Sequence, residues 1–85
     1  MKEVVIPIEF TDFVIHAGAD FTIDSVSIKD QKMFLVKGHS FLKDNVRNRY
    51  EIYQVGTPIV NLHLKELQYV SQKGSWAYYF YKVIV

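Results

Sequence analysis

The chain has 85 residues, of which 49% are hydrophobic, 15% aromatic and 22% charged, and its net charge is +1. This length allows one domain, which we place at residues 1–85, and the apolar content excludes a largely disordered chain. Cysteine is absent, which excludes disulfides, thiolate catalysis and cysteine-based zinc sites.

The first predicted element is a strand over residues 4–10, because apolar side chains recur there at every second position. Pro7 cannot donate a hydrogen bond to a neighbouring strand. We therefore expect this strand to lie at a sheet edge or to contain a bulge.

Residues 11–20 have two equally good interpretations, a single helical turn and an ordered loop. Thr11 or Asp12 has a side chain suited to the N-cap of a turn. Gly18 is suited to ending that turn. Neither interpretation contains a strand.

Two further strands are predicted over residues 21–29 and 33–37, with Gly38 ending the second. The apolar alternation slips within the first of them, which indicates a bulge near Asp24-Ser25. Asp30-Gln31 is suited to a two-residue turn, although the preferred glycine is missing.

The polar segment over residues 39–48 is predicted to be a loop. Residues 50–55 are rich in β-forming side chains, so a strand is expected there. Gly56-Thr57-Pro58 should end that strand.

Residues 58–73 fit either a strand or a helix. Pro58 at a first helical position and Gly74 after a helix end would frame a helix. Against this, apolar residues alternate with polar ones from Val60 onward, and the phase shifts at Glu66. We favour a bulged strand over a helix, followed by a turn around Gly74.

The last segment, residues 76–85, is the clearest strand because it is almost wholly aromatic and β-branched. Both of its faces are apolar, so we expect it to be covered on both sides. Phe80 and Ile84, or their opposite-face neighbours Tyr79 and Tyr81, should be buried in the core.

These elements predict an all-β fold with five or six strands and at most one short helix. Short connections in so small a chain favour a small barrel or a highly twisted antiparallel sheet, similar in type to OB, SH3-like and PUA-like domains. A closed barrel would also remove the exposed sheet edges.

The basic side chains gather in the second part of the chain and suggest a nucleic-acid site. Arginine binds phosphate with two hydrogen bonds and stacks on bases, and aromatic rings stack on bases as well. The alternative is a solvated loop whose cations pair with Asp44 and Glu51. The candidate nucleic-acid-binding residues are Lys37, Lys43, Arg47, Arg49, Tyr50 and Tyr53.

The aromatic last strand is a candidate interface, since an apolar strand with rings on both faces should not remain in water. We expect a homo-oligomer in which at least two aromatic residues of this strand lie at the contact. The candidates are Trp76, Tyr78, Tyr79 and Tyr81.

No catalytic or metal site is expected. His16, His39 and His63 have no partner at metal-ligand spacing. There is no nucleophile elbow and no glycine-rich phosphate loop. We therefore predict a protein that is not an enzyme and has no cofactor.

Two functions are predicted from these residues. The first is a small regulatory module that binds RNA or single-stranded nucleic acid. The second is a protein-binding or self-assembling accessory protein, such as an inhibitor. The composition resembles that of small proteins of phages and mobile elements in low-GC bacteria. No segment reaches the ~20 apolar residues that a bilayer requires, so a cytoplasmic protein with no membrane contact is expected.

Overall fold

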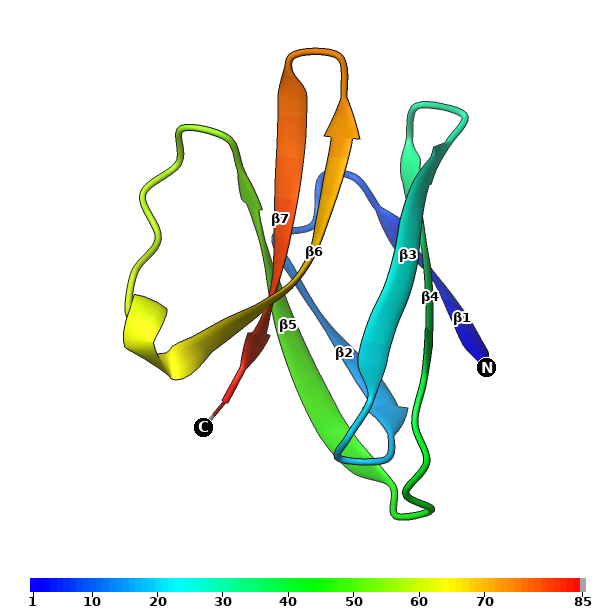
Figure 1. Cartoon of the computed structure of the whole chain (residues 1–85). Helices are drawn as coiled ribbons and strands as arrows, with labels where there is room; N and C mark the ends of the chain where they lie inside the picture. The colour runs from blue at the N-terminus through cyan, green and yellow to red at the C-terminus, as the bar shows by residue number, and fades with distance from the viewer. Residues whose placement is uncertain (85) are drawn as a thin grey trace.

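Two antiparallel β-sheets pack face to face in this protein, as Figure 1 shows. The structure is a computed structural model that describes residues 1–84. One sheet has the strand order β1-β4-β3 and the other has the order β2-β5-β7-β6. The elements are β1 (Lys2–Pro7), β2 (Asp12–Ala17), β3 (Thr22–Lys29), β4 (Met33–His39), β5 (Val46–Gln54), the 3₁₀ turn η1 (Leu62–Leu64), β6 (Lys65–Lys73) and β7 (Trp76–Val83).

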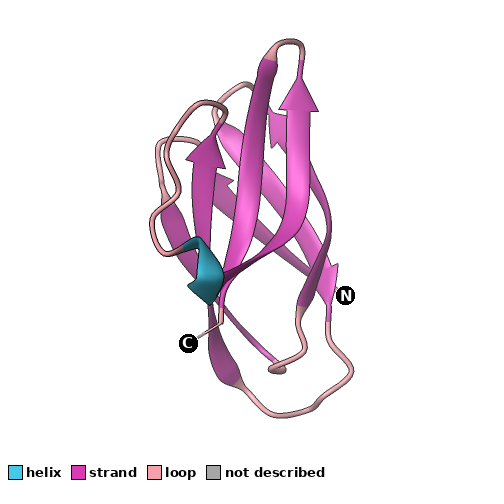
Figure 2. Cartoon of the chain, turned by 60° about the vertical axis from the view of Figure 1, so that its left-hand side comes forward, coloured by secondary structure: helices cyan, strands magenta, loops and turns pink. Residues whose placement is uncertain are grey.

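The predicted all-β fold class is confirmed, and both sheets are twisted and antiparallel. Residues 1–84 contain seven strands, not the five or six expected. Within this range no hydrogen-bonded ladder joins the two sheets, so the result is a sandwich and not a closed barrel. Helical structure in the described chain is limited to η1, which lies near the C-terminal end in Figure 2. No helix of residues 1–84 has the length and apolar character needed to cross a membrane.

Residues 11–20 contain a strand, β2, that was not predicted. Phe13 and Ile15 are buried, whereas Asp12 and His16 are exposed. Val14 stands between the two buried residues, so three apolar residues in a row hide the alternation. β2 forms because β5 supplies an antiparallel partner along its whole length.

The hairpin of β3 and β4 largely follows the prediction. The register shifts between Ile23 and Ser25, which confirms the bulge at Asp24. Asp30 and Gln31 both adopt positive φ values, 52° and 56°. A tight turn that matches strand twist requires such values at its two central positions.

Gly38 does not end β4 as expected but is buried within it. A Cβ atom at this position would lie 2.5 Å from Cζ of the Phe21 ring. The missing side chain therefore makes room for a core ring, which is a packing role that the glycine's position in the sequence did not reveal.

The bulged strand favoured for residues 58–73 is confirmed only from Lys65 onward, as β6. Its register shifts between Leu67 and Tyr69, which places the bulge at Gln68 and not at Glu66. Residues 59–64 form a loop and η1. They cannot join the strand because β5 and β6 run parallel on either side of β7, so their connection must cross the sheet.

β7 lies between β5 and β6, and its residues Phe80 and Tyr81 are buried on opposite faces. Ile84 was expected in the core but is 59% exposed, because β7 ends one residue before it. Val85, which was predicted to continue this strand, lies outside the described residues.

Aromatic rings from both sheets fill the space between them. The Phe34 and Phe80 ring centroids are 5.2 Å apart in an edge-to-face arrangement that joins the sheets. Phe13 stacks on Tyr50 with centroids 5.2 Å apart. Such pairs add about 0.5–1.5 kcal/mol each to the free energy of burying the rings.

Candidate functional site

The six candidate nucleic-acid residues do not form one surface. Arg47, Arg49 and Tyr53 share the outer face of β5, the face turned away from the other sheet. Lys37 lies on the outer face of the opposite sheet, on β4, where its Nζ is 3.8 Å from Oε1 of Glu3. The cluster seen in the sequence is therefore divided between two sides of the sandwich.

Arg47 lies in β5 and not in the loop predicted over residues 39–48, and Arg49 follows in the same strand. The loop prediction was wrong for residues 46–48, because Asn48 is a polar residue whose side chain points into the core. The alternation of Arg47 and Arg49 with buried residues makes both arginines face outward.

Arg49 and Tyr53 belong to a polar network centred on Glu51. The Arg49 guanidinium lies 3.4 Å from Glu51 and 3.6 Å from Asp12. The Tyr53 hydroxyl donates to Glu51 Oε1 at 2.6 Å, and Lys65 Nζ lies 3.3 Å from the same oxygen. Two of the proposed nucleic-acid contacts are thus already occupied within the chain.

The pKa values in this network show how closely its groups interact. Burial alone would raise the pKa of Glu51, but hydrogen bonds from Tyr53 and Lys65 and the charges of Lys65 and Arg49 outweigh it and lower the pKa. The hydrogen bond to Glu51 is the main reason that the pKa of Tyr53 rises to about 12. The carboxylate is held in its charged form by its neighbours.

Tyr50 was predicted to stack on a base, and this prediction is wrong. Its side chain is 0% exposed, and its hydroxyl donates to the Phe21 carbonyl at 3.2 Å. Burial raises the pKa of Tyr50 well above its usual value. The ring is a core residue because it faces inward with Ile52.

Lys43 and Arg47 take part in no ion pair within residues 1–84. Lys43 lies in the β4–β5 connection, at the lower end of the sandwich in Figure 1. Arg47 is paired in register with His16 of β2, close to the same end. We call this end, with the β2–β3 and β4–β5 connections, the lower end.

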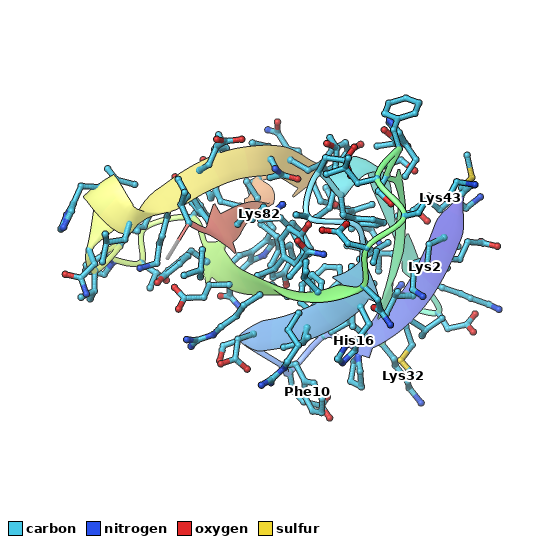
Figure 3. All side chains as sticks on the ribbon, turned by 90° about the horizontal axis from the view of Figure 1, so that it is seen from below. Lys2, Phe10, His16, Lys32, Lys43 and Lys82 are labelled. Carbon is cyan, nitrogen blue, oxygen red and sulfur yellow. The ribbon has the colours of Figure 1, made fainter. Side chains whose placement is uncertain are left out.

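A hollow of about 310 Å³ opens at the lower end and collects cationic groups from distant parts of the sequence. Figure 3, seen from below, shows Lys43, Lys2 and His16 following one another across this end. Its polar lining consists of Lys2, His16, His39, Ser40, Lys43 and Asp44. An anion placed here would meet two lysine ammonium groups, one from β1 and one from the β4–β5 connection.

The two connections that form the hollow are held together by hydrogen bonds. The Asp20 carboxylate accepts from the backbone N–H groups of Phe41 at 2.9 Å and Leu42 at 3.2 Å. Asp44 accepts from the N–H of Ala19 at 3.2 Å. The N–H of Phe41 is the largest cause that lowers the pKa of Asp20. The Asp20 and Asp44 carboxylates therefore stabilise the backbone of these two connections.

The β2–β3 connection is also anchored from the core side. The Asn48 side-chain amide donates to carbonyls of Gly18 at 3.0 Å and Ile15 at 3.2 Å. Lys82 Nζ donates to the carbonyl of Ala19 at 2.8 Å. This connection passes from one sheet to the other, and these bonds hold it in position.

Phe41 projects from the rim of this end, where its side chain is 81% exposed. Its ring is in edge contact with the His39 ring, with centroids 5.1 Å apart. His39 in turn lies 2.7 Å from the Asp24 carboxylate. The lower end thus combines lysine ammonium groups with one solvent-exposed aromatic ring.

Three of these residues were not predicted. Lys2 is remote from Lys43 in the sequence, whereas His39 and Phe41 stand close before Lys43 but were not predicted to bind nucleic acid. Phe41 could have been predicted as a stacking residue, since it stands two positions before Lys43. Lys2 gave no signal, because only the folding of β1 beside β4 brings it here.

The four candidate interface residues differ widely in exposure. Trp76 is 56% exposed, whereas Tyr81 is buried and so cannot lie at a surface contact. Tyr78 and Tyr79 are half-buried, and the Tyr78 ring packs at 4.9 Å from Phe34. Trp76 and Tyr78 line an apolar hollow of about 300 Å³ at the opposite, upper end of the sandwich.

The polar groups of residues 1–84 show no arrangement suited to holding a metal ion, since no three His, Asp or Glu side chains gather there. Comparisons of this chain with protein-family models, with curated proteins and with solved structures find no match. Its function must therefore be argued from its own geometry.

Proposed function

We propose that this protein is a small non-enzymatic module that binds single-stranded nucleic acid at its lower end. The observation that carries the proposal is the convergence of Lys2 and Lys43 on one hollow beside the exposed ring of Phe41. In this proposal the two lysines contact phosphates, and Phe41 stacks on a base.

The chemistry of the hollow fits this ligand. Lysine ammonium groups bind phosphate as point charges, and an aromatic ring stacks on any base because every base has a π face. The Asp20 and Asp44 carboxylates lie close by, but both accept backbone hydrogen bonds. Arg47, which is exposed at the start of β5, extends the cationic surface along the strand.

Salt dependence separates the two kinds of contact. Each phosphate contact to a single strand adds about 0.7 to the slope of log affinity against log salt. Lys2→Gln combined with Lys43→Gln should therefore flatten the slope by about 1.4. Phe41→Ala should lower the affinity by ~1–3 kcal/mol with little change in slope, since stacking releases no counterions.

The assay is fluorescence anisotropy of a labelled single-stranded oligonucleotide at several salt concentrations. The matched control is Lys29→Gln combined with Lys32→Gln, which removes two exposed lysines at the upper end. This control should bind like the wild type. The proposal fails if the wild type shows no binding at low salt, or if both double variants lose affinity equally.

A second candidate function, protein binding, is favoured by the upper end. Its apolar hollow is lined by Ile8, Ile28, Trp76 and Tyr78, a lining that suits an apolar side chain of another protein. Trp76 is the only tryptophan of the chain, so with a partner that lacks tryptophan the fluorescence reports on this hollow alone. A partner that fills it should shift the emission to shorter wavelength. Unchanged emission in the presence of a bound protein would exclude contact at this end.

A further inference from the structure

Three of the four sheet edges are blocked. Directly after β1, the N–H of Ile8 donates to the Lys32 carbonyl, which sets the phase of the β1–β4 ladder. The main-chain groups of Lys2, Val4 and Ile6 therefore face β4, and those of Pro7 face outward. Pro7 has no N–H, so this edge cannot complete a new ladder.

β3 and β6 block each other's edges. Each contains a bulge, at Asp24 and at Gln68. The two strands lie side by side, and the Gln68 side-chain oxygen accepts from the N–H of Ile23 at 3.1 Å. A bulge disrupts the regular spacing that strand addition needs.

The fourth edge, that of β2, has no such protection. The N–H of Ile52 donates to the Thr11 carbonyl at 2.7 Å, which sets the phase of the β2–β5 ladder. Phe13, Ile15 and Ala17 therefore direct their main-chain groups toward β5. Asp12, Val14 and His16 direct theirs away from the sheet, and no strand within residues 1–84 pairs with them.

We propose that the free edge of β2 pairs with β2 of a second copy of this chain, in an antiparallel arrangement with Val14 opposite Val14. This register places Asp12 opposite the partner's His16, and the two-fold axis repeats the same pair on the other side. Each opposed pair exchanges two main-chain hydrogen bonds. The two four-stranded sheets then form one continuous sheet.

The side chains of β2 select this register. If the partner strand is shifted so that Asp12 stands opposite the partner's Asp12, two like charges face each other, which is unfavourable. A shift toward the other end opposes His16 to its own copy. Only the register centred on Val14 places each Asp12 opposite a His16 of the other copy. Asp12 already has Arg49 at 3.6 Å on its own sheet, and Arg47 stands beside His16.

A second feature favours a second copy of this chain as the partner that pairs with the free edge of β2. The exposed Phe10 precedes β2, and Figure 3 shows its side chain projecting on the same side as His16. The antiparallel register brings the partner's lower end toward this ring. An isologous two-fold contact also closes after two copies, so it produces a dimer and not a filament.

Sedimentation velocity over a range of concentrations tests the pairing. The wild type should change from a mass of 10.0 kDa toward twice that value. His16→Asp, which opposes two carboxylates, should weaken dimerisation by about tenfold, because the axis repeats each altered pair. Asp12→Lys should have a similar effect. The double variant, Asp12→Lys with His16→Asp, should restore the dimer. His63→Asp, an exposed histidine far from β2 in the sequence, is the matched control.

Val14→Pro provides an independent test. The N–H of Val14 faces the free edge, so proline removes no hydrogen bond within the chain but blocks the new ladder. This variant should fold and remain a monomer. A wild type that is monomeric at every concentration overturns the proposal, and so does a dimer that survives Val14→Pro. A dimer whose formation shifts Trp76 emission would place the contact at the upper end instead. None of these outcomes bears on nucleic-acid binding by the monomer.

Discussion

Replacing Asn48 by aspartate should destabilise the fold far more than the small chemical change suggests. The side chain is 5% exposed. Its amide nitrogen lies 3.0 Å from the Gly18 carbonyl, 3.2 Å from that of Ile15 and 3.4 Å from that of Ala17. Three carbonyl oxygens surround this atom, so the position demands a donor.

The loss of stability depends on which polar or charged groups each substitution leaves without a hydrogen-bond partner. Asn48→Ala removes two good hydrogen bonds, which are worth about 0.5–1.5 kcal/mol each. The Gly18 carbonyl keeps the N–H of Phe21 at 3.0 Å as a donor, so the loss should stay near ~1–3 kcal/mol in total. Asn48→Asp places a carboxylate among carbonyl oxygens, and an uncompensated buried charge costs about 3–5 kcal/mol.

The two variants should also differ in their pH dependence. The carboxyl introduced by Asn48→Asp is buried without a donor, so its pKa in the folded state should rise above the unfolded value of about 3.9. Stability from such a group is fully present below the unfolded pKa and is lost as the pH rises through the folded pKa. Asn48→Asp should therefore recover stability relative to Asn48→Ala as the pH falls from neutral.

Urea unfolding of the wild type and both variants at neutral and mildly acidic pH provides the measurement. Asn45→Asp, at an exposed position in the β4–β5 connection, controls for the added charge. Equal destabilisation by Asn48→Asp and Asn48→Ala, with no dependence on pH, would refute this account of the Asn48 hydrogen bonds.

Three other predictions concern stability and tyrosine ionisation. Phe80→Ala should cost ~3–5 kcal/mol in urea unfolding, whereas Ile84→Ala should stay within about 0.5 kcal/mol. Gly38→Ala should cost ~1–3 kcal/mol, since its methyl group would collide with a core ring. In an ultraviolet titration, Tyr50 and Tyr53 should ionise last. Their raised pKa values stabilise the fold below about pH 10, and this stability should be lost at higher pH; Tyr53→Phe should remove one late phase.

The prediction for β1 succeeded because proline imposes a constraint that does not depend on the rest of the fold. Pro7 lacks an N–H wherever it is placed, so the strand that contains it was expected to lie at an edge or to contain a bulge, and it lies at an edge. The bulge at Asp24 was predicted for a similar reason, since the phase of the apolar residues shifts within one strand. Local covalent and periodic constraints of this kind can be read from a sequence.

The candidate site was harder to predict because one buried polar residue hid a strand. Arg47, Arg49 and Glu51 alternate with Asn48, Tyr50 and Ile52, and this alternation would have placed the tyrosine in the core. The segment looked like a loop because asparagine is normally exposed. Its burial depends on carbonyl groups of the β2–β3 connection, about thirty residues away in the chain. No local pattern contains that information.

The barrel prediction rested on the short connections and on the removal of exposed sheet edges, and the structure shows why the aromatic rings favour a sandwich. Closure would require β3 and β6 to pair at the spacing of about 4.8 Å that a ladder imposes. Their bulges at Asp24 and Gln68 prevent this, and a glutamine side chain spans the gap to the N–H of Ile23. Sheets that pack face to face stand about 10 Å apart. That separation accommodates edge-to-face rings such as Phe34 and Phe80, with centroids 5.2 Å apart. The large aromatic rings therefore pack between two separate sheets. The bulges in β3 and β6 prevent these two strands from joining the sheets on their side of the sandwich.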